Sequence, residues 1–77
     1  MGKDTFLNEL GVGDKGKIKR IICTGRLKKK FLDMGLIPGT AVEIIKVAPF
    51  GDPIDVKIKG YHLSLRKEEA DQIEVTV

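Results

Sequence analysis

The stretch IDVKIKGYHLSLR, residues 54–66, alternates apolar and polar side chains on both sides of a glycine. Side chains two residues apart lie on the same face of a strand. Residues 54–59 are therefore predicted to form a strand with three apolar side chains on a buried face and charged ones in water. After a turn at Gly60-Tyr61, residues 62–66 repeat the alternation and are predicted to bury both of their leucines.

The segment upstream of this stretch, residues 40–48, predicts another strand with an irregular pattern. Val42 and Ile44 share one face, and then Ile45 and Val47 continue on the other, so the apolar phase slips by one residue. Such a slip indicates a bulge or a strong bend, which a strand needs where it turns a barrel corner.

Two further strands are predicted near the ends of the chain. Residues 17–23 would form the first strand, with Ile18 and Ile22 on the same face. Residues 73–77 alternate three apolar side chains with polar ones and would form the last. Short helical turns are predicted over residues 4–10 and 67–71.

One amphipathic helix is predicted over Arg26–Met34. Leu27, Phe31 and the last residue of this range follow the i, i+4, i+7 spacing of a single apolar face. Gly35 suits the left-handed residue that ends many helices, and Pro38 prevents continuation.

The composition predicts a single globular domain over residues 1–77. Hydrophobic residues make up 42% and charged residues 32% of the chain, a balance that argues against disorder. The sequence contains no apolar run long enough for a membrane span and no signal-peptide pattern at its start. We therefore expect a soluble, cytoplasmic protein.

These elements together predict a mainly β fold: a small five-stranded barrel with an inserted short α-helix. Glycine and proline residues separate the strands, and closure into a barrel would remove the unpaired edges that a flat sheet exposes. The helix would cap one open end of the barrel.

Three motifs carry a family resemblance: LDMGLIPG at residues 32–39, APFGDP at 48–53 and LSLR at 63–66. In this order and spacing they resemble the FeoA family, and the resemblance extends over about the whole chain. It implies an SH3-like barrel that works beside FeoB, a ferrous-iron transporter with a cytoplasmic GTPase domain. The chain would then be recruited to the inner face of the membrane.

The resemblance leaves a second hypothesis open. A related SH3-like domain ends some iron-dependent repressors, so this chain could instead be a stand-alone, metal-responsive regulatory domain. A helix-turn-helix is not predicted, and no aromatic residues are interleaved with the basic ones, so a nucleic-acid partner is not expected.

Neither a catalytic residue nor a cofactor or metal site is predicted. One histidine, His62, and one cysteine, Cys23, are too few for a nucleophile–base arrangement or a two-His-one-carboxylate iron site. Cys23 is interpreted as a small buried hydrophobe and His62 as a solvent-facing strand residue. We therefore expect a non-enzymatic protein.

Protein docking is the favoured function, through two loops that carry apolar side chains at turns. The predicted contact residues are Leu36, Ile37, Pro38, Pro49, Phe50, Asp52 and Pro53. Proline pre-orders such a loop and lowers the entropic cost of binding. The alternative, that Phe50 packs back over one end of the barrel, stays open, as does weak self-association.

A basic cluster on the predicted helix is a further candidate for electrostatic docking. Its members are Arg26, Lys28, Lys29 and Lys30. These side chains could meet an acidic protein surface or anionic lipid beside a transporter. The alternative is that they form only the solvated face of an amphipathic helix.

Overall fold

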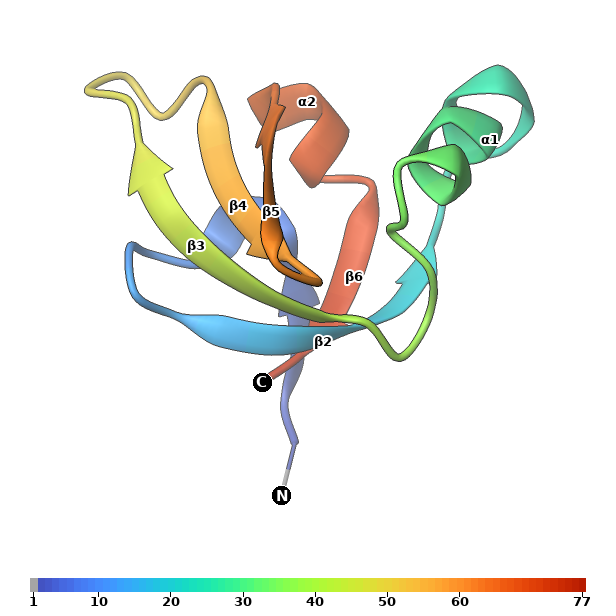
Figure 1. Cartoon of the computed structure of the whole chain (residues 1–77), viewed down its shortest axis with the longest axis horizontal. Helices are drawn as coiled ribbons and strands as arrows, with labels where there is room; N and C mark the ends of the chain where they lie inside the picture. The colour runs from blue at the N-terminus through green and yellow to red at the C-terminus, as the bar shows by residue number, and fades with distance from the viewer. Residues whose placement is uncertain (1) are drawn as a thin grey trace.

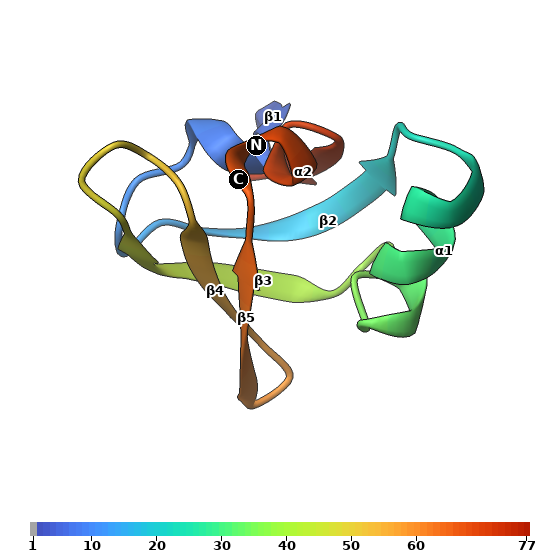
Figure 2. The same ribbon diagram turned by 90° about the horizontal axis from the view of Figure 1, so that it is seen from above.

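The computed structural model describes residues 2–77 and shows six strands arranged in one strongly curved sheet (Figures 1 and 2). In chain order the elements are β1 (Asp4–Phe6), the 3-10 helix η1 (Leu7–Glu9), β2 (Lys15–Ile21), α1 (Gly25–Asp33), β3 (Ala41–Val47), β4 (Ile54–Ile58), β5 (Tyr61–Leu65), α2 (Lys67–Ala70) and β6 (Ile73–Thr76).

The sheet has the order β1-β6-β2-β3-β4-β5, and every neighbouring pair is antiparallel. The fold is mainly β, as predicted, but it has six strands and not five. The additional strand is β1, which pairs with β6 from Asp4 opposite Thr76 to Phe6 opposite Glu74. The prediction of a helical turn over residues 4–10 is wrong for these three residues and holds only for η1, because so short an edge strand has no alternation to reveal it.

The alternation of β4 is confirmed, since Ile54, Val56 and Ile58 are each at most 3% exposed. On β5, Leu65 is buried and Leu63 is half-buried against the core. Burying apolar side chains on the concave side of the curved sheet supplies most of the stabilisation of such a fold. The core members are Leu7, Ile18, Ile21, Phe31, Leu36, Val42, Ile44, Ile54, Val56, Ile58, Leu65, Ala70, Ile73 and Val75.

The irregularity predicted for the strand before this hairpin is confirmed. The register of β3 against β4 shifts between Ile44 and Lys46. An extra residue on one strand bends it and increases its twist, so this bulge contributes to the curvature of the sheet.

The face predicted for the first strand is wrong. Ile18 and Ile22 were predicted to share a face. In the structure Ile18 and Ile21 are buried, whereas Ile22 lies beyond the end of β2 and is 44% exposed. The physical reason is a second register shift, between Ile18 and Arg20 where β2 pairs with β6. Such a shift moves the following side chains to the opposite face.

The apolar face of α1 covers one end of the sheet. Phe31 on this face is fully buried, and Leu27 packs against the core, as does Met34 directly after the helix. Gly35 ends the helix with a φ of +94°, a conformation that favours glycine. The Tyr61 hydroxyl donates a hydrogen bond to the Met34 carbonyl and ties the start of β5 to the end of α1.

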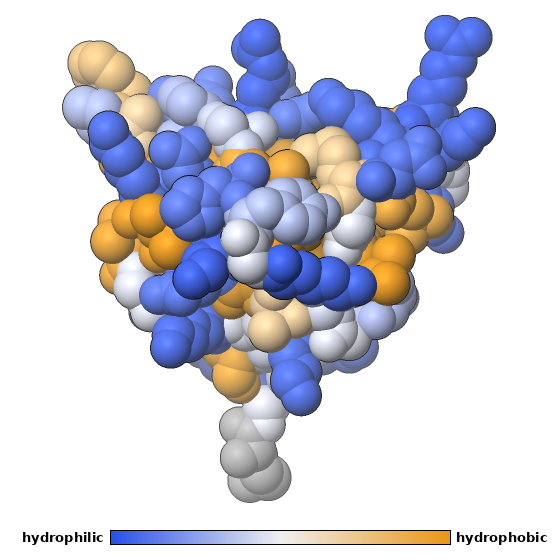
Figure 3. Space-filling model, in the orientation of Figure 1, coloured by the Kyte–Doolittle hydropathy of each residue, from blue (hydrophilic) through white to orange (hydrophobic). Residues whose placement is uncertain are grey.

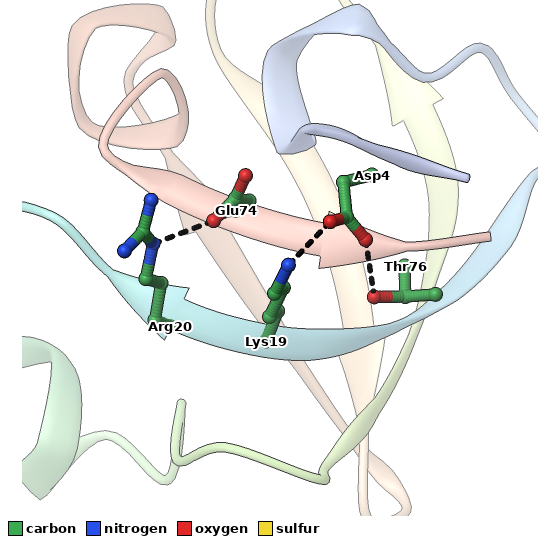
Figure 4. A network of polar contacts seen from close by, with 5 residues as sticks. All are labelled: Asp4, Lys19, Arg20, Glu74 and Thr76. Atoms are coloured by element: carbon green, nitrogen blue, oxygen red, sulfur yellow. Dashed lines mark hydrogen bonds and ion pairs between the residues drawn. The ribbon is translucent and has the colours of Figure 1, made fainter. Parts of the chain in front are cut away.

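A polar network joins the outer sides of β1, β2 and β6 (Figure 4). The Asp4 carboxylate accepts hydrogen bonds from the Lys19 ammonium and, at 2.9 Å, from the Thr76 hydroxyl, while Arg20 Nε lies 2.6 Å from Glu74 Oε1. The bond from Lys19 is the main reason that the pKa of Asp4 lies below its usual value. Surface pairs of this kind contribute little stability, but they neutralise Lys19 and Arg20.

Candidate docking surface

The most exposed large apolar side chain in residues 2–77 is Phe50, at 95% exposure. It stands at the tip of the loop of residues 48–53, the Phe50 loop, which connects β3 with β4 and projects at one corner of the molecule (Figure 1). Hydrophobic atoms protrude at the same corner of the surface (Figure 3). The alternative in which Phe50 packs back over the barrel is therefore wrong.

Backbone hydrogen bonds give the Phe50 loop a defined shape. Gly51 N donates to the Ala48 carbonyl at 2.7 Å, and Ala48 N donates to the Pro53 carbonyl at 3.1 Å. Asp52 Oδ1 accepts a hydrogen bond of 3.0 Å from Lys67 N at the start of α2. Asp52, one of the predicted contact residues, thus fastens the loop to α2, while Phe50 faces outward.

The structure corrects the second predicted loop. Leu36 has no exposed surface, and its N–H donates to the Phe31 carbonyl at 3.0 Å, so it belongs to the core and cannot touch a partner. Ile37 is 39% exposed and Pro38 is also exposed. Only these two residues of the loop remain available as contacts.

The two predicted loops do not form one surface. They flank opposite ends of β3, as both views of the ribbon show (Figures 1 and 2). A strand advances by about 3.3 Å per residue, so seven residues separate the loops by roughly 20 Å. A partner of ordinary size can reach both, but a short peptide in one groove would meet only one.

A cleft of about 430 Å³ joins the base of the Phe50 loop to α1 and α2. Its lining residues are Lys30, Asp52, Pro53, Ser64, Leu65, Arg66 and Glu69. Lys30 Nζ lies 3.0 Å from Glu69 Oε2, so the structure brings one member of the predicted basic cluster into an ion pair. Arg26, Lys28 and Lys29 are exposed on α1.

Sequence reasoning did not single out Arg66 and Glu69 as part of this cleft. The available signal was Glu69, three residues after Arg66, the residue that precedes the helical turn; this is the spacing of a capping box. In the structure Arg66 N donates to Glu69 Oε1 at 2.9 Å. This hydrogen bond is the main reason that the pKa of Glu69 lies below its usual value. The Lys30 ammonium lowers the pKa further, although partial burial acts in the opposite direction.

The lowered pKa of Glu69 predicts a pH-dependent contribution to stability, to be tested with Glu69→Gln. The ionised carboxylate stabilises the fold fully above the unfolded value of 4.5, and this contribution is lost as pH falls through the lower folded pKa. At neutral pH we expect the wild-type chain to be more stable than the variant by up to about 1 kcal/mol, since Lys30 is solvent-exposed. Urea denaturation should show this difference vanish in acid; a constant difference would contradict the assignment.

The remaining residues considered for chemistry lie apart from this surface. Cys23 is half-buried and packs against the core, and His62 is exposed on β5. In residues 2–77, histidine, cysteine and acidic side chains do not gather in threes that could hold a metal ion. Over the same residues, the helices are too short and too polar to cross a membrane.

The FeoA domain family model matches residues 5–77. A curated relative, the Fe(2+) transport protein A/Fe(2+) transporter FeoB fusion protein of Porphyromonas gingivalis, is 39% identical over 69 residues. The match covers 90% of this chain but only 8% of the fusion protein.

Solved structures agree with this relationship. The iron(II) transport protein A of Clostridium thermocellum superposes with a TM-score of 0.91 at 46% identity, over 95% of this chain and 45% of that one. A zinc complex of Stenotrophomonas maltophilia FeoA, described as an SH3 domain protein, has a TM-score of 0.82 at 20% identity over 92% of this chain and 88% of that one.

The same fold also occurs in a manganese-dependent transcriptional repressor. That protein matches with a TM-score of 0.87 at 21% identity, over 97% of this chain and 42% of the repressor. At this identity the likeness concerns the fold alone. The SH3-like architecture expected from the sequence is thus confirmed, and since the family model spans nearly every residue, the chain belongs to the FeoA family.

Proposed function

We propose that this chain is a non-enzymatic, cytoplasmic accessory protein of ferrous-iron uptake, which docks on a FeoB-type transporter and modulates its GTPase. The observation that carries the proposal is the Porphyromonas gingivalis relative, in which a sequence 39% identical to this one is fused to such a transporter. A fusion holds two parts at high effective concentration, which is useful when the separate parts act together.

The Phe50 loop supports docking as the physical means. Aromatic side chains supply much of the binding energy at protein interfaces when they enter a pocket of the partner. Phe50 is 95% exposed on a loop that hydrogen bonds already order, so little conformational entropy would be lost on binding.

A titration against the purified transporter, full length and as its separate soluble GTPase domain, tests the proposal. We expect saturable binding, micromolar or tighter, to at least one of the two. Binding to the GTPase domain alone would place the contact on the cytoplasmic side of the transporter. Failure to bind either form, with nucleotide and ferrous iron present, would overturn the proposal.

The second candidate is a stand-alone, metal-responsive regulatory domain. Its supporting observation is the fold shared with the manganese-dependent transcriptional repressor, which bears on architecture only. A gel shift at low salt separates the two candidates, because operator-selective DNA binding would favour regulation over docking.

A further inference from the structure

The outer side of the sheet carries a group of lysines that the docking proposal does not use. Lys15 and Lys17 lie on β2, Lys57 lies on β4, and Lys59 follows the end of β4. These four residues are called the lysine face below. All are exposed, and within residues 2–77 none of them forms an ion pair.

Strand register places these lysines side by side. Lys15 lies opposite Glu43 on β3, and Glu43 in turn lies opposite Lys57, so one row crosses three strands. Lys17 lies opposite Ala41 in the next row. Neighbouring strands are about 4.8 Å apart, so Lys15 and Lys57 are roughly 10 Å apart across β3.

Two shallow clefts confirm that the four side chains border one surface. A cleft of about 220 Å³ is lined by Lys15, Glu43, Lys57 and Lys59, together with Ala41. A second, of about 350 Å³, has Lys15, Lys17 and Ala41 on its rim and is mainly apolar because Val77 contributes to it. In Figure 3, hydrophilic side chains surround paler and hydrophobic atoms low on the molecule, where β2 and β3 run in Figure 1.

Counted together with Glu43, the lysine face carries a charge equal to the formal net charge of the chain. Its four lysines and Glu43 sum to +3, and the whole chain also carries +3, with 14 basic and 11 acidic residues. The other 10 basic and 10 acidic residues therefore cancel. Lys19, also on β2, differs from the lysine face because it forms an ion pair with Asp4.

The chemistry of the face favours a diffuse anionic surface over an individual carboxylate. All four cations are lysines, and the arginines Arg20, Arg26 and Arg66 lie elsewhere. Lysine presents a mobile point charge on a long stem, whereas arginine is the residue that pairs bidentately with carboxylates at protein interfaces. The clefts are shallow, and Ala41 and Val77 give them an apolar floor, while Glu43 lies between Lys15 and Lys57.

We propose that the lysine face binds the anionic headgroups of a lipid bilayer. Clusters of four or more basic residues are attracted to anionic membranes. Each lysine near the membrane surface adds to the binding free energy. This inference rests on the proposed function, since docking on a membrane transporter brings the chain next to a bilayer. The Phe50 loop follows Val47, at the opposite end of β3 from Ala41, so the two proposed contacts use different parts of the chain.

Vesicle co-sedimentation tests the proposal without the transporter. The probes are phosphatidylcholine vesicles with and without about one-third phosphatidylserine, at low and high salt. We expect binding to the anionic vesicles only, and its loss at high salt. The variant Lys15→Gln/Lys17→Gln/Lys57→Gln should reduce the partition coefficient roughly 100-fold, about fivefold per lysine.

A second triple variant, Arg26→Gln/Lys28→Gln/Lys29→Gln on α1, removes the same charge from another place. It should weaken vesicle binding by no more than about fivefold, because those side chains lie on α1 and not on the outer side of the sheet. Equal losses in the two variants, or no binding of the wild-type chain to anionic vesicles, would overturn the proposal. The proposal would also be overturned if the Lys15→Gln/Lys17→Gln/Lys57→Gln variant, the sheet variant, lost affinity for the soluble GTPase domain but kept its vesicle binding. In that case the lysine face would bind an acidic protein surface.

Failure of this inference is distinguishable from failure of the docking proposal. Phe50→Ala leaves the lysine face intact and should bind vesicles like the wild-type chain. The sheet variant leaves the Phe50 loop intact and should bind the soluble GTPase domain normally.

Discussion

Phe50→Ala should weaken binding to the transporter by about 30-fold or more, the effect of losing an interface hot spot. The side chain is 95% exposed, so its removal costs the free chain no packing. The loop keeps its hydrogen bonds to Ala48, Pro53 and Lys67, because none of them involves the aromatic ring. Calorimetric titration measures the affinity, and urea denaturation should show unchanged stability.

Ile37→Ala is the matched control for this prediction. Ile37 is also an exposed apolar loop residue, but it lies at the opposite end of β3. A smaller loss of affinity in Ile37→Ala is expected if the Phe50 loop carries the contact. Wild-type affinity in Phe50→Ala would contradict the assignment of this loop as the docking site.

Leu36→Ala should destabilise the fold by about 2–5 kcal/mol, the usual cost of truncating a buried leucine to alanine. Leu36 has no exposed surface, and it follows α1 where the chain turns back into the core. A single core in a chain of this size supplies only about 3–5 kcal/mol, so much of the variant should be unfolded at room temperature. Urea denaturation followed by circular dichroism measures the change.

The adjacent residue supplies the comparison here too. Ile37→Ala removes a similar side chain one position along, yet it should cost less than about 1 kcal/mol because Ile37 is partly exposed. If both substitutions had the same small effect, Leu36 would not be a core residue. The prediction also explains why a loss of binding in Leu36→Ala would report unfolding and not a lost contact.

The basic cluster on α1 and the lysine face differ in how their side chains come together and in whether they form ion pairs. On α1, Lys30 forms an ion pair with Glu69 of α2, and this pair borders a cleft beside the Phe50 loop. On the sheet, Lys15 and Lys17 come from one strand and Lys57 from another, so only strand pairing makes them neighbours. A count of charges along the sequence detects the first surface and misses the second.

Local patterns in the sequence determined most of the secondary structure. Strict alternation predicts β4, helical spacing predicts α1, and the slipped phase of residues 40–48 predicts the bulge between Ile44 and Lys46. These features depend on the period of side chains along one element, and that period is written in consecutive residues. The motifs at residues 32–39, 48–53 and 63–66 likewise sufficed to indicate the family.

Only the tertiary structure decided which apolar residues are buried where the pattern is short or irregular. The strand β1 exists because β6 offers an edge to pair with, and the shift between Ile18 and Arg20 makes Ile21, not Ile22, a core residue. Leu36 and Phe50 were both predicted as contact residues from their loop motifs, yet Leu36 is fully buried and Phe50 is almost fully exposed. Exposure depends on what packs against a side chain from distant parts of the sequence, and no local period records that information.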